Sequence, residues 1–308
     1  MRFDSIFRPG LFAGQTIIVT GGGSGIGRCT AHELAHLGAT VAIVGRSTAK
    51  LETVAAEIAD AGGTALSFTC DIREETQVRE VVRQLLVRQG RVDGLVNNAG
   101  GQFAAPLAAI SQRGWDAVVR NNLTGGFLFA RECYTQWMAD HGGAIINMVA
   151  DFFGSMVGMG HSGAARAGMV SFTETAAVEW GISGVRVNAI APGWIASSGM
   201  QTYPEALRPH LKVMHRAIPL QRLGTESEVS AAICFLLSPA AAFISGITLR
   251  VDGAAPNARL ASPLSAFLPG APENAARGQC TWPLGEHELS QPWNGFHLAG
   301  PTKLFTDE

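Results

Sequence analysis

A string of glycines follows the first apolar run of the chain. Residues 20–27 read Thr-Gly-Gly-Gly-Ser-Gly-Ile-Gly, directly after the β-branched run at residues 16–20. Glycines between a strand and a helix let backbone N–H groups and the helix dipole receive a pyrophosphate. In a chain with 37 glycines the string alone is weak evidence, so its place between strand and helix carries the prediction. The residues predicted to line this phosphate site are Gly21, Gly23, Ser24, Gly25, Ile26 and Gly27.

The end of the second apolar run indicates which dinucleotide such a site would prefer. An acidic residue at this point binds the adenosine ribose diol of NAD, but here Gly45 stands in its place and Arg46 follows. A guanidinium pairs with a 2′-phosphate, whereas a carboxylate would repel it. The sequence therefore favours NADP(H) over NAD(H). The alternative is that Arg46 is an exposed loop arginine.

Composition and charge exclude other classes of partner. The formal net charge of −2 argues against a broad nucleic-acid surface. No uninterrupted apolar run approaches the roughly 18 residues that a membrane span needs, and the N-terminus lacks the apolar region of a signal peptide. The five cysteines are widely spaced without a CxxC pair, so they predict neither a zinc site nor a redox pair. We expect a cytoplasmic protein with a small-molecule substrate, no bound metal, and no nucleic-acid or membrane partner.

Apolar runs alternate with helical patterns along most of the chain. The predicted strands are residues 16–20, 40–44, 66–70, 94–96, 144–149 and 186–189. The predicted helices include residues 29–37, 48–61 and 76–89. Strands that alternate with helices form right-handed βαβ units and a parallel sheet that is covered on both faces. The predicted fold class is α/β, a Rossmann-type doubly wound parallel sheet in a single domain.

The composition changes near residue 254. Residues 254–308 are rich in proline, contain two of the six tryptophans and show few periodic apolar positions. This segment is too short for a core of its own, so we expect an extended C-terminal arm. Residues 1–253 are predicted to form the dinucleotide-binding catalytic domain.

Four motifs in order along the chain resemble those of the short-chain dehydrogenase/reductase family. They are the glycine string, Asn-Asn-Ala-Gly at residues 97–100, Asn122 followed by Leu-Thr-Gly, and Pro-Gly-Trp-Ile-Ala-Ser at residues 192–197. The resemblance extends over most of the chain before the arm. It implies that a cofactor groove is lined by Asp71 and Ile72 at the adenine, by Asn98, Ala99 and Gly100 along the groove, and by Pro192, Gly193, Ile195 and Ser197 at the carboxamide.

The chain departs from this family where the active-site Tyr-xxx-Lys belongs. Ser162 stands in place of the tyrosine and Arg166 in place of the lysine. The usual active-site serine is also missing, because Val-Ala-Asp occupies residues 149–151. Neither Tyr134 nor Tyr203 has a lysine four residues further on. The proton donor of an ordinary carbonyl reductase is therefore absent.

This departure favours a reaction whose anion is delocalised. A serine hydroxyl is far less acidic than the usual tyrosine, and Arg166 does not lose its proton. Ser162 can still donate one hydrogen bond to a substrate oxygen, and Arg166 can anchor the nicotinamide ribose. Reduction of an α,β-unsaturated thioester fits, because hydride transfer to the β-carbon leaves an enolate that aimed donors stabilise. Residues 161–168, together with residues 98–103, resemble the same segments of peroxisomal trans-2-enoyl-CoA reductases, so we expect an NADPH-dependent reductase of an enoyl-CoA thioester.

Two other functions stay open. The whole chain also resembles citronellol/citronellal dehydrogenases, which implies alcohol–aldehyde chemistry on an apolar substrate. That chemistry needs another proton donor, such as Tyr203 or a water held by Asn122. The missing tyrosine and lysine also favour a nucleotide-binding protein without catalysis.

Further candidates surround the predicted site. Asp151 is a candidate acid or base, or else a hydrogen-bond acceptor for a neighbouring loop. The resemblance implies that Asn122 bends its helix and holds a water. His161 is interpreted as a structural residue at a helix start. A substrate lid is expected at about residues 198–222, where basic side chains would meet coenzyme A phosphates or form a solvated face.

Small residues predict close packing of the helix that begins near residue 161. Gly163, Ala164, Ala165 and Gly168 lie along it. We expect this helix to pack against a neighbouring subunit, as the resemblance also implies, and the protein to be a homodimer or homotetramer.

Overall fold

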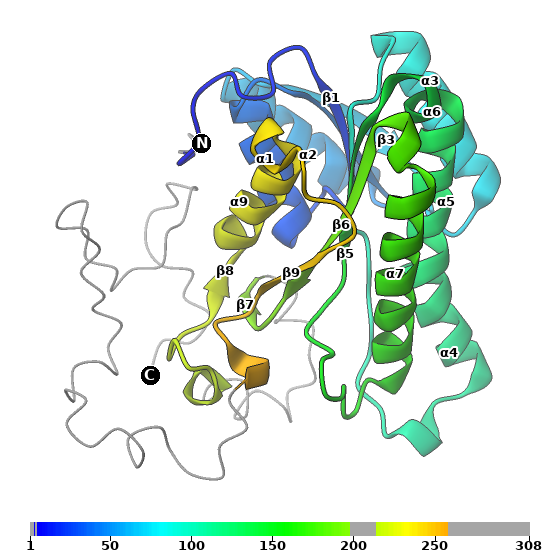
Figure 1. Cartoon of the computed structure of the whole chain (residues 1–308), viewed down its shortest axis with the longest axis vertical. Helices are drawn as coiled ribbons and strands as arrows, with labels where there is room; N and C mark the ends of the chain where they lie inside the picture. Colours follow the sequence, from blue (N-terminus) through cyan, green and yellow to red (C-terminus); the bar gives the residue numbers. More distant parts are fainter. Residues whose placement is uncertain (1–2, 4, 198–213, 258–308) are drawn as a thin grey trace, which may run out of the picture.

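A computed structural model of the chain describes residues 3, 5–197 and 214–257 (Figure 1). Most of the expected lid and nearly all of the expected arm lie outside these described residues. Tyr203 and Cys280 lie outside them as well. The division of the chain at residue 253 therefore stays a prediction.

Seven parallel strands form one sheet through the centre of the molecule. Its order is β3-β2-β1-β4-β5-β6-β9. The strands are β1 (Thr16–Thr20), β2 (Thr40–Gly45), β3 (Thr64–Thr69), β4 (Gly94–Asn97), β5 (Gly143–Met148), β6 (Val185–Pro192) and β9 (Thr248–Val251). Strand order reverses between β1 and β4, and ligands of open parallel sheets bind in the crevice at such a switch point.

Helices cover both faces of this sheet (Figure 1). One face carries α1 (Gly25–His36), α2 (Thr48–Asp60) and α9 (Glu226–Leu237). The other carries α3 (Glu75–Gln89), α5 (Gly125–Cys133) and α7 (Gly160–Glu179). The helix before α5 consists of α4 (Gln112–Val119) and the π-helical turn η2 (Arg120–Thr124). A short pair, β7 (Ile195–Ala196) with β8 (Gly224–Thr225), lies beyond β6.

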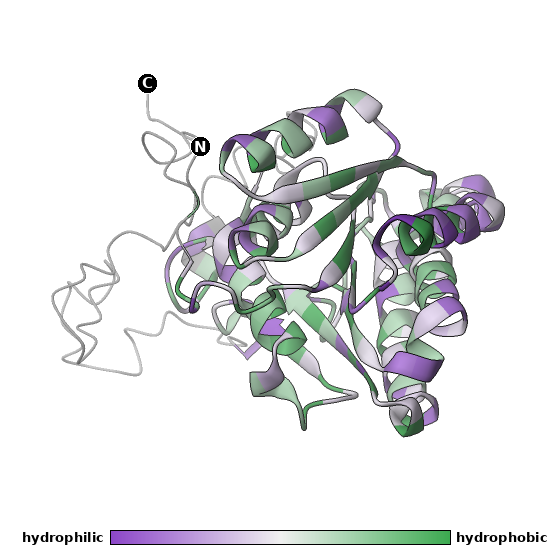
Figure 2. Cartoon of the chain, turned by 90° about the horizontal axis from the view of Figure 1, so that it is seen from above, coloured by the Kyte–Doolittle hydropathy of each residue, from purple (hydrophilic) through white to green (hydrophobic). Residues whose placement is uncertain are grey.

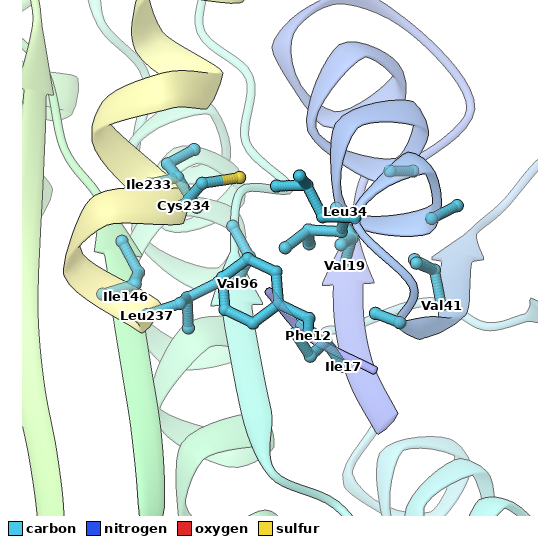
Figure 3. Packing of buried hydrophobic residues seen from close by; sticks show 14 of the residues in the cluster. Phe12, Ile17, Val19, Leu34, Val41, Val96, Ile146, Ile233, Cys234 and Leu237 are labelled. Carbon is cyan, nitrogen blue, oxygen red and sulfur yellow. The ribbon is translucent and has the colours of Figure 1, made fainter. Parts of the chain in front are cut away.

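Two apolar cores lie between the sheet and its helix layers. Figure 3 shows the first, in which Leu34 of α1 and Ile233 of α9 meet Val19 and Val96 of the sheet. Seen from above, apolar residues run along the strands and polar residues lie on outer helix faces (Figure 2). The described cysteines are free and buried: Cys29, Cys70, Cys133 and Cys234.

The predicted fold class is confirmed, with shifted element boundaries. Helix α1 begins at Gly25, four residues before the predicted start at residue 29, because the glycine loop itself forms its first turn. Strand β6 continues to Pro192, beyond the predicted end at residue 189. The pattern analysis did not predict the edge strand β9 or helix α9.

Candidate active site

The glycine loop packs against the segment that follows β4. Gly21 has a φ of +67°, and a Cβ there would lie 2.9 Å from Nδ2 of Asn98. A Cβ on Gly27 would collide with the same Asn98 amide and with the Gly21 carbonyl. Asn98 Nδ2 in turn donates to the Thr20 carbonyl at 2.9 Å. Both glycines are therefore required for the loop, α1 and Asn98 to meet this closely.

A cavity of about 300 Å³ opens at this loop, where β1, β2, β3 and β4 end. Its lining contains nine of the predicted cofactor residues, namely Gly21, Gly23, Ser24, Arg46, Asp71, Ile72, Asn98, Ala99 and Gly100. Seven other predicted cofactor residues and Arg166 do not line it. The seven are Gly25, Ile26 and Gly27, which belong to α1, and Pro192, Gly193, Ile195 and Ser197, which lie at β6 and β7.

Six further residues line the cavity that were not among the predicted cofactor residues: Gly45, Ser47, Lys50, Leu51, Cys70 and Asn121. Lys50 belongs to the first turn of α2, four residues after Arg46, so two cationic side chains border one end of the cavity. That spacing after Arg46 is the signal by which Lys50 could have been found. Asp71 accepts hydrogen bonds from Arg73 at 2.8 Å and 3.1 Å, and these lower the pKa of the Asp71 carboxyl to about 2.

Arg166 of α7 lies beside Gly100. A Cβ on Gly100 would lie 2.7 Å from Nη2 of Arg166, so only glycine leaves room for the guanidinium. Its Nη1 donates to the Met148 carbonyl at 2.5 Å, and Nε has no partner among the described residues. Burial lowers the pKa of Arg166 to about 10, so the guanidinium stays charged at neutral pH.

Asn122 fixes the backbone of the loop that follows Gly100. Its Oδ1 accepts from the Gly101 N–H at 2.9 Å, and its Nδ2 donates to the Gly101 carbonyl at 3.0 Å. The residue is buried in the π-helical turn η2, which interrupts the helix at the place where a bend was expected. A catalytic role of Asn122 stays a prediction.

Ser162 lies in the first turn of α7 and is 0% exposed. Its Oγ donates a hydrogen bond of 2.6 Å to Oε1 of Gln102. Gln102 was not predicted as a site residue, because the two partners are 60 positions apart. His161 is buried, its Nδ1 accepts from the Ser162 N–H at 2.9 Å, and its ring packs edge-on against Phe103. This geometry agrees with the structural interpretation of His161.

Asp151 follows β5 and borders the Pro-Gly segment. Its N–H donates to the Pro192 carbonyl at 3.0 Å. Burial and the nearby carboxylate of Asp252 raise the pKa of the Asp151 carboxyl, so it holds a proton at higher pH than a free aspartate. A Cβ on Gly193 would lie 2.8 Å from the Cα of Asp252, so this segment packs directly against the end of β9.

Within the described part of the chain, no phenol lies near Ser162. Tyr134 stacks on Trp180 and shares a hydrogen bond of 3.0 Å with Ser183. Both partners follow the C-terminal end of α7, and its 20 residues span roughly 30 Å from the end that carries Ser162. The other tyrosine, Tyr203, lies outside the described residues.

Two expectations about the surroundings of the site, the basic lid and the packing of α7 against a neighbouring subunit, stay predictions. Arg222, expected in a basic lid, pairs with both carboxylate oxygens of Glu228 at 2.9 Å and 2.6 Å, so its charge is already neutralised. Among the small residues of α7, Gly168 and Ala165 pack inside their own chain, since a Cβ on Gly168 would lie 3.0 Å from Leu123 and Ala165 is buried. Ala164 is exposed, and the oligomeric state stays a prediction.

The described residues contain no helix with the length and apolar character that crossing a bilayer requires. In residues 3, 5–197 and 214–257, no cluster of three or more His, Cys, Asp or Glu side chains is arranged to hold a metal ion.

Known proteins resemble this chain over most of its length. The profile of a family described as "Enoyl-(Acyl carrier protein) reductase" matches residues 21–254. A Bacillus subtilis (strain 168) protein named "Probable 2,4-dienoyl-CoA reductase [(2E)-enoyl-CoA-producing]" is 37% identical over 243 residues, which are 78% of this chain and 95% of that protein.

Solved structures are similar over the same region. A structure named "citronellol catabolism dehydrogenase (AtuB)" from Pseudomonas aeruginosa PAO1 is 60% identical, with a TM-score of 0.75, and the match covers 82% of this chain and 100% of that one. A structure of an NAD(P)-dependent gluconate 5-dehydrogenase, so described, from Beutenbergia cavernae contains bound NADP. It is 34% identical, with a TM-score of 0.75, over 80% of this chain and 99% of that one.

Proposed function

The chain belongs to the short-chain dehydrogenase/reductase family, and we propose that it is an NADPH-dependent reductase of the C=C bond of a trans-2-enoyl-CoA thioester. One observation carries the proposal. Ser162 and Arg166 are buried at the positions where a tyrosine and a lysine are expected, and neither side chain readily gives up a proton at neutral pH. Such a pair stabilises an anion rather than protonating it.

The groove fits NADP(H). Gly21, Gly23 and Ser24 line the cavity directly before α1 begins, so their backbone and the N-terminus of α1 would receive a pyrophosphate. Arg46 and Lys50 border one end of the cavity and would hold the 2′-phosphate, while Asp71 and Ile72 would flank the adenine. When bound, the nicotinamide supplies the hydride. The remaining proposed contacts are Ser24, Asn98, Ala99 and Gly100 along the groove, Arg166 at the ribose, and Pro192, Gly193, Ile195 and Ser197 at the carboxamide.

Charge stabilisation is the main task of the protein in this reaction. The product gains a hydride at the β-carbon and a proton at the α-carbon, and between these steps negative charge lies on the thioester oxygen. We propose that Ser162 donates a hydrogen bond to this oxygen and that the buried charge of Arg166 lowers the energy of the enolate. Asp151, whose pKa is raised, would supply the proton that the α-carbon gains, directly or through a water held by Asn122.

An apolar rim beside Ser162 supports an acyl substrate. Phe103, Leu107 and Val157 expose large parts of their side chains to solvent. Their two loops are joined by a hydrogen bond of 2.8 Å from the Ala105 N–H to the Gly158 carbonyl, directly before α7 begins. Grouped exposed apolar side chains favour contact with an apolar ligand.

A second candidate function is alcohol–aldehyde oxidoreduction on a citronellol-like substrate. The 60% identity to the Pseudomonas aeruginosa structure of that name favours it. This chemistry produces a localised alkoxide, which needs a proton as it forms. A proton donor other than Ser162 would then be required.

A substrate screen separates these functions. The full chain is purified, and NADPH oxidation is followed with trans-2-enoyl-CoA thioesters and with citronellal-type aldehydes. We expect turnover of the thioesters at a much higher kcat/KM than of the aldehydes. Faster turnover of the aldehydes would replace the first proposal with the second. NADPH binding without turnover of either class would identify a nucleotide-binding protein without catalysis.

A further inference from the structure

The hydroxyl proton of Ser162 already has a recipient. A serine hydroxyl carries one proton and donates one hydrogen bond, and here that bond goes to Oε1 of Gln102 at 2.6 Å. Ser162 is fully buried, so no solvent molecule takes over this contact. In this arrangement Ser162 cannot donate to a substrate oxygen. The role proposed for Ser162 therefore requires the pair to rearrange.

The amide group of Gln102 permits this rearrangement without breaking the pair. One end of an amide accepts hydrogen bonds and the other end donates them. If the amide rotates by half a turn, Nε2 donates to Oγ of Ser162. The Ser162 hydroxyl can then donate its own hydrogen bond to the substrate. The terminal torsion of glutamine is soft, so such a rotation does not require movement of the backbone.

We propose that Gln102 is a positioning residue: rotation of its amide switches the hydrogen bond that Ser162 donates from Gln102 to the substrate thioester oxygen. The proposal rests on the function proposed above. With the amide rotated, the order of donation is Gln102 Nε2–H to Ser162 Oγ, then Ser162 O–H to the enolate oxygen. Consecutive hydrogen bonds polarise one another, so the second bond strengthens as charge builds up on the substrate.

The surrounding contacts hold the backbone of Gln102 on both sides. On one side, Asn122 binds both the N–H and the carbonyl of Gly101. On the other, the Phe103 ring packs edge-on against His161, with ring centroids 4.4 Å apart and an interplanar angle of 87°. These contacts hold the backbone on both sides of Gln102, so the proposed switch requires rotation of the amide and no movement of the backbone.

Replacing Gln102 with glutamate tests the switch. A carboxylate has the same shape as the amide but only accepts hydrogen bonds, so it retains the Ser162 proton. We expect Gln102→Glu to lose roughly 10²-fold in kcat at about pH 8, comparable to Ser162→Ala. A protonated glutamate can donate, so kcat of Gln102→Glu relative to wild type should rise as the pH falls toward about 5.

Two matched variants separate this effect from a structural one. Gln102→Met has similar length and leaves the Ser162 proton free, so it should keep more activity at about pH 8 than Gln102→Glu. The double variant Gln102→Glu with Ser162→Ala should show no recovery at low pH. Titratable neighbours, namely His161, Arg166 and Asp151, are the same in every variant, so the wild-type profile corrects for them. NADPH binding, followed by fluorescence, checks that each variant retains the cofactor site.

The outcomes distinguish the two proposals. A kcat of Ser162→Ala equal to wild type would overturn the proposed use of Ser162, whatever Gln102 does. A reduced kcat in Ser162→Ala, together with a Gln102→Glu variant that matches wild type or has a flat relative pH profile, would overturn the switch alone. A recovery at low pH that persists in the double variant would also overturn it.

Discussion

At the scale of single residues, two side chains at one end of the cavity set the predicted cofactor preference. Arg46 and Lys50 border the same end. The carboxylate of Asp71 already accepts hydrogen bonds from Arg73. A charge-assisted hydrogen bond is worth about 1.5–3 kcal/mol, so Arg46→Ala should weaken NADPH binding roughly tenfold to hundredfold. NADH lacks the 2′-phosphate, so its affinity should change less than about twofold in the same variant.

Fluorescence titration with both nucleotides measures this difference. Lys50→Ala should show the same selectivity with a smaller loss, because an ammonium makes no bidentate contact with phosphate. Arg83→Ala is a suitable control, since Arg83 is exposed on α3 and pairs with Glu80. Equal weakening of NADPH and NADH in Arg46→Ala would assign Arg46 a structural role instead.

The site was predictable where a local pattern carries the information. The glycines, Asn98 and Arg46 follow strand ends, and the carboxyl ends of neighbouring parallel strands lie at one edge of the sheet. The Ser162–Gln102 hydrogen bond joins residues 60 positions apart, and glutamine has no special role in the local pattern. Such a contact depends on how two loops pack, so the sequence alone did not indicate it.

At the scale of elements, a buried carboxyl joins the N-terminal segment to two helices. Glu33 of α1 is fully buried and accepts hydrogen bonds from Ser230 of α9 and, at 3.0 Å, from Ser5. Burial raises the pKa of Glu33 from 4.5 to about 7. The folded protein thus binds this proton more tightly than the unfolded chain.

This difference predicts a pH dependence of stability. The contribution of Glu33 is complete below about pH 4.5, declines as the pH rises, and is lost above about pH 7. The interval corresponds to about 3 kcal/mol in the free energy of unfolding. Glu33→Gln should remove this decline, because glutamine does not titrate, and its amide can accept from one serine and donate to the hydroxyl oxygen of the other.

Urea unfolding at pH values on both sides of this interval measures the effect. The exposed Glu52 of α2 provides a matched control, and Glu52→Gln should follow the wild-type profile. Parallel pH profiles for wild type and Glu33→Gln would show that Glu33 does not cause the decline.

The strands and helices differ in how clearly their sequences predict them. Strands β1, β2 and β5 are buried on both faces, and their continuous apolar runs predicted them. Helix α9 was missed although Thr225 and Glu228 form a capping box, a signal that is readable in the sequence. The edge strand β9 is short and only half-buried, so its pattern is weak.

At the scale of the whole molecule, exposed apolar side chains lie near one edge of the sheet. Among the described residues, strand β9 pairs with β6 and with no strand on its other side. Near this edge the loop at Gly246 packs against Ala177 of α7, and the neighbouring side chains of Val178, Ile182 and Phe243 are 82%, 95% and 105% exposed. An exposed edge strand beside apolar side chains is a hazard for a monomer, because it promotes pairing with other chains.

We therefore propose that a second copy of the chain covers this edge and that the protein is a homodimer or homotetramer. A stable interface buries roughly 800 Å² on each partner, and charges introduced at its centre are costly because they lose their hydration. Phe243→Asp combined with Ile182→Asp should reduce the mass measured by light scattering from that of an oligomer to a smaller species. Val87→Asp is the matched control, since Val87 is 77% exposed on α3, on the opposite half of the sheet. A monomeric wild type would refute the proposal, and an unchanged mass of the double variant would place the interface elsewhere.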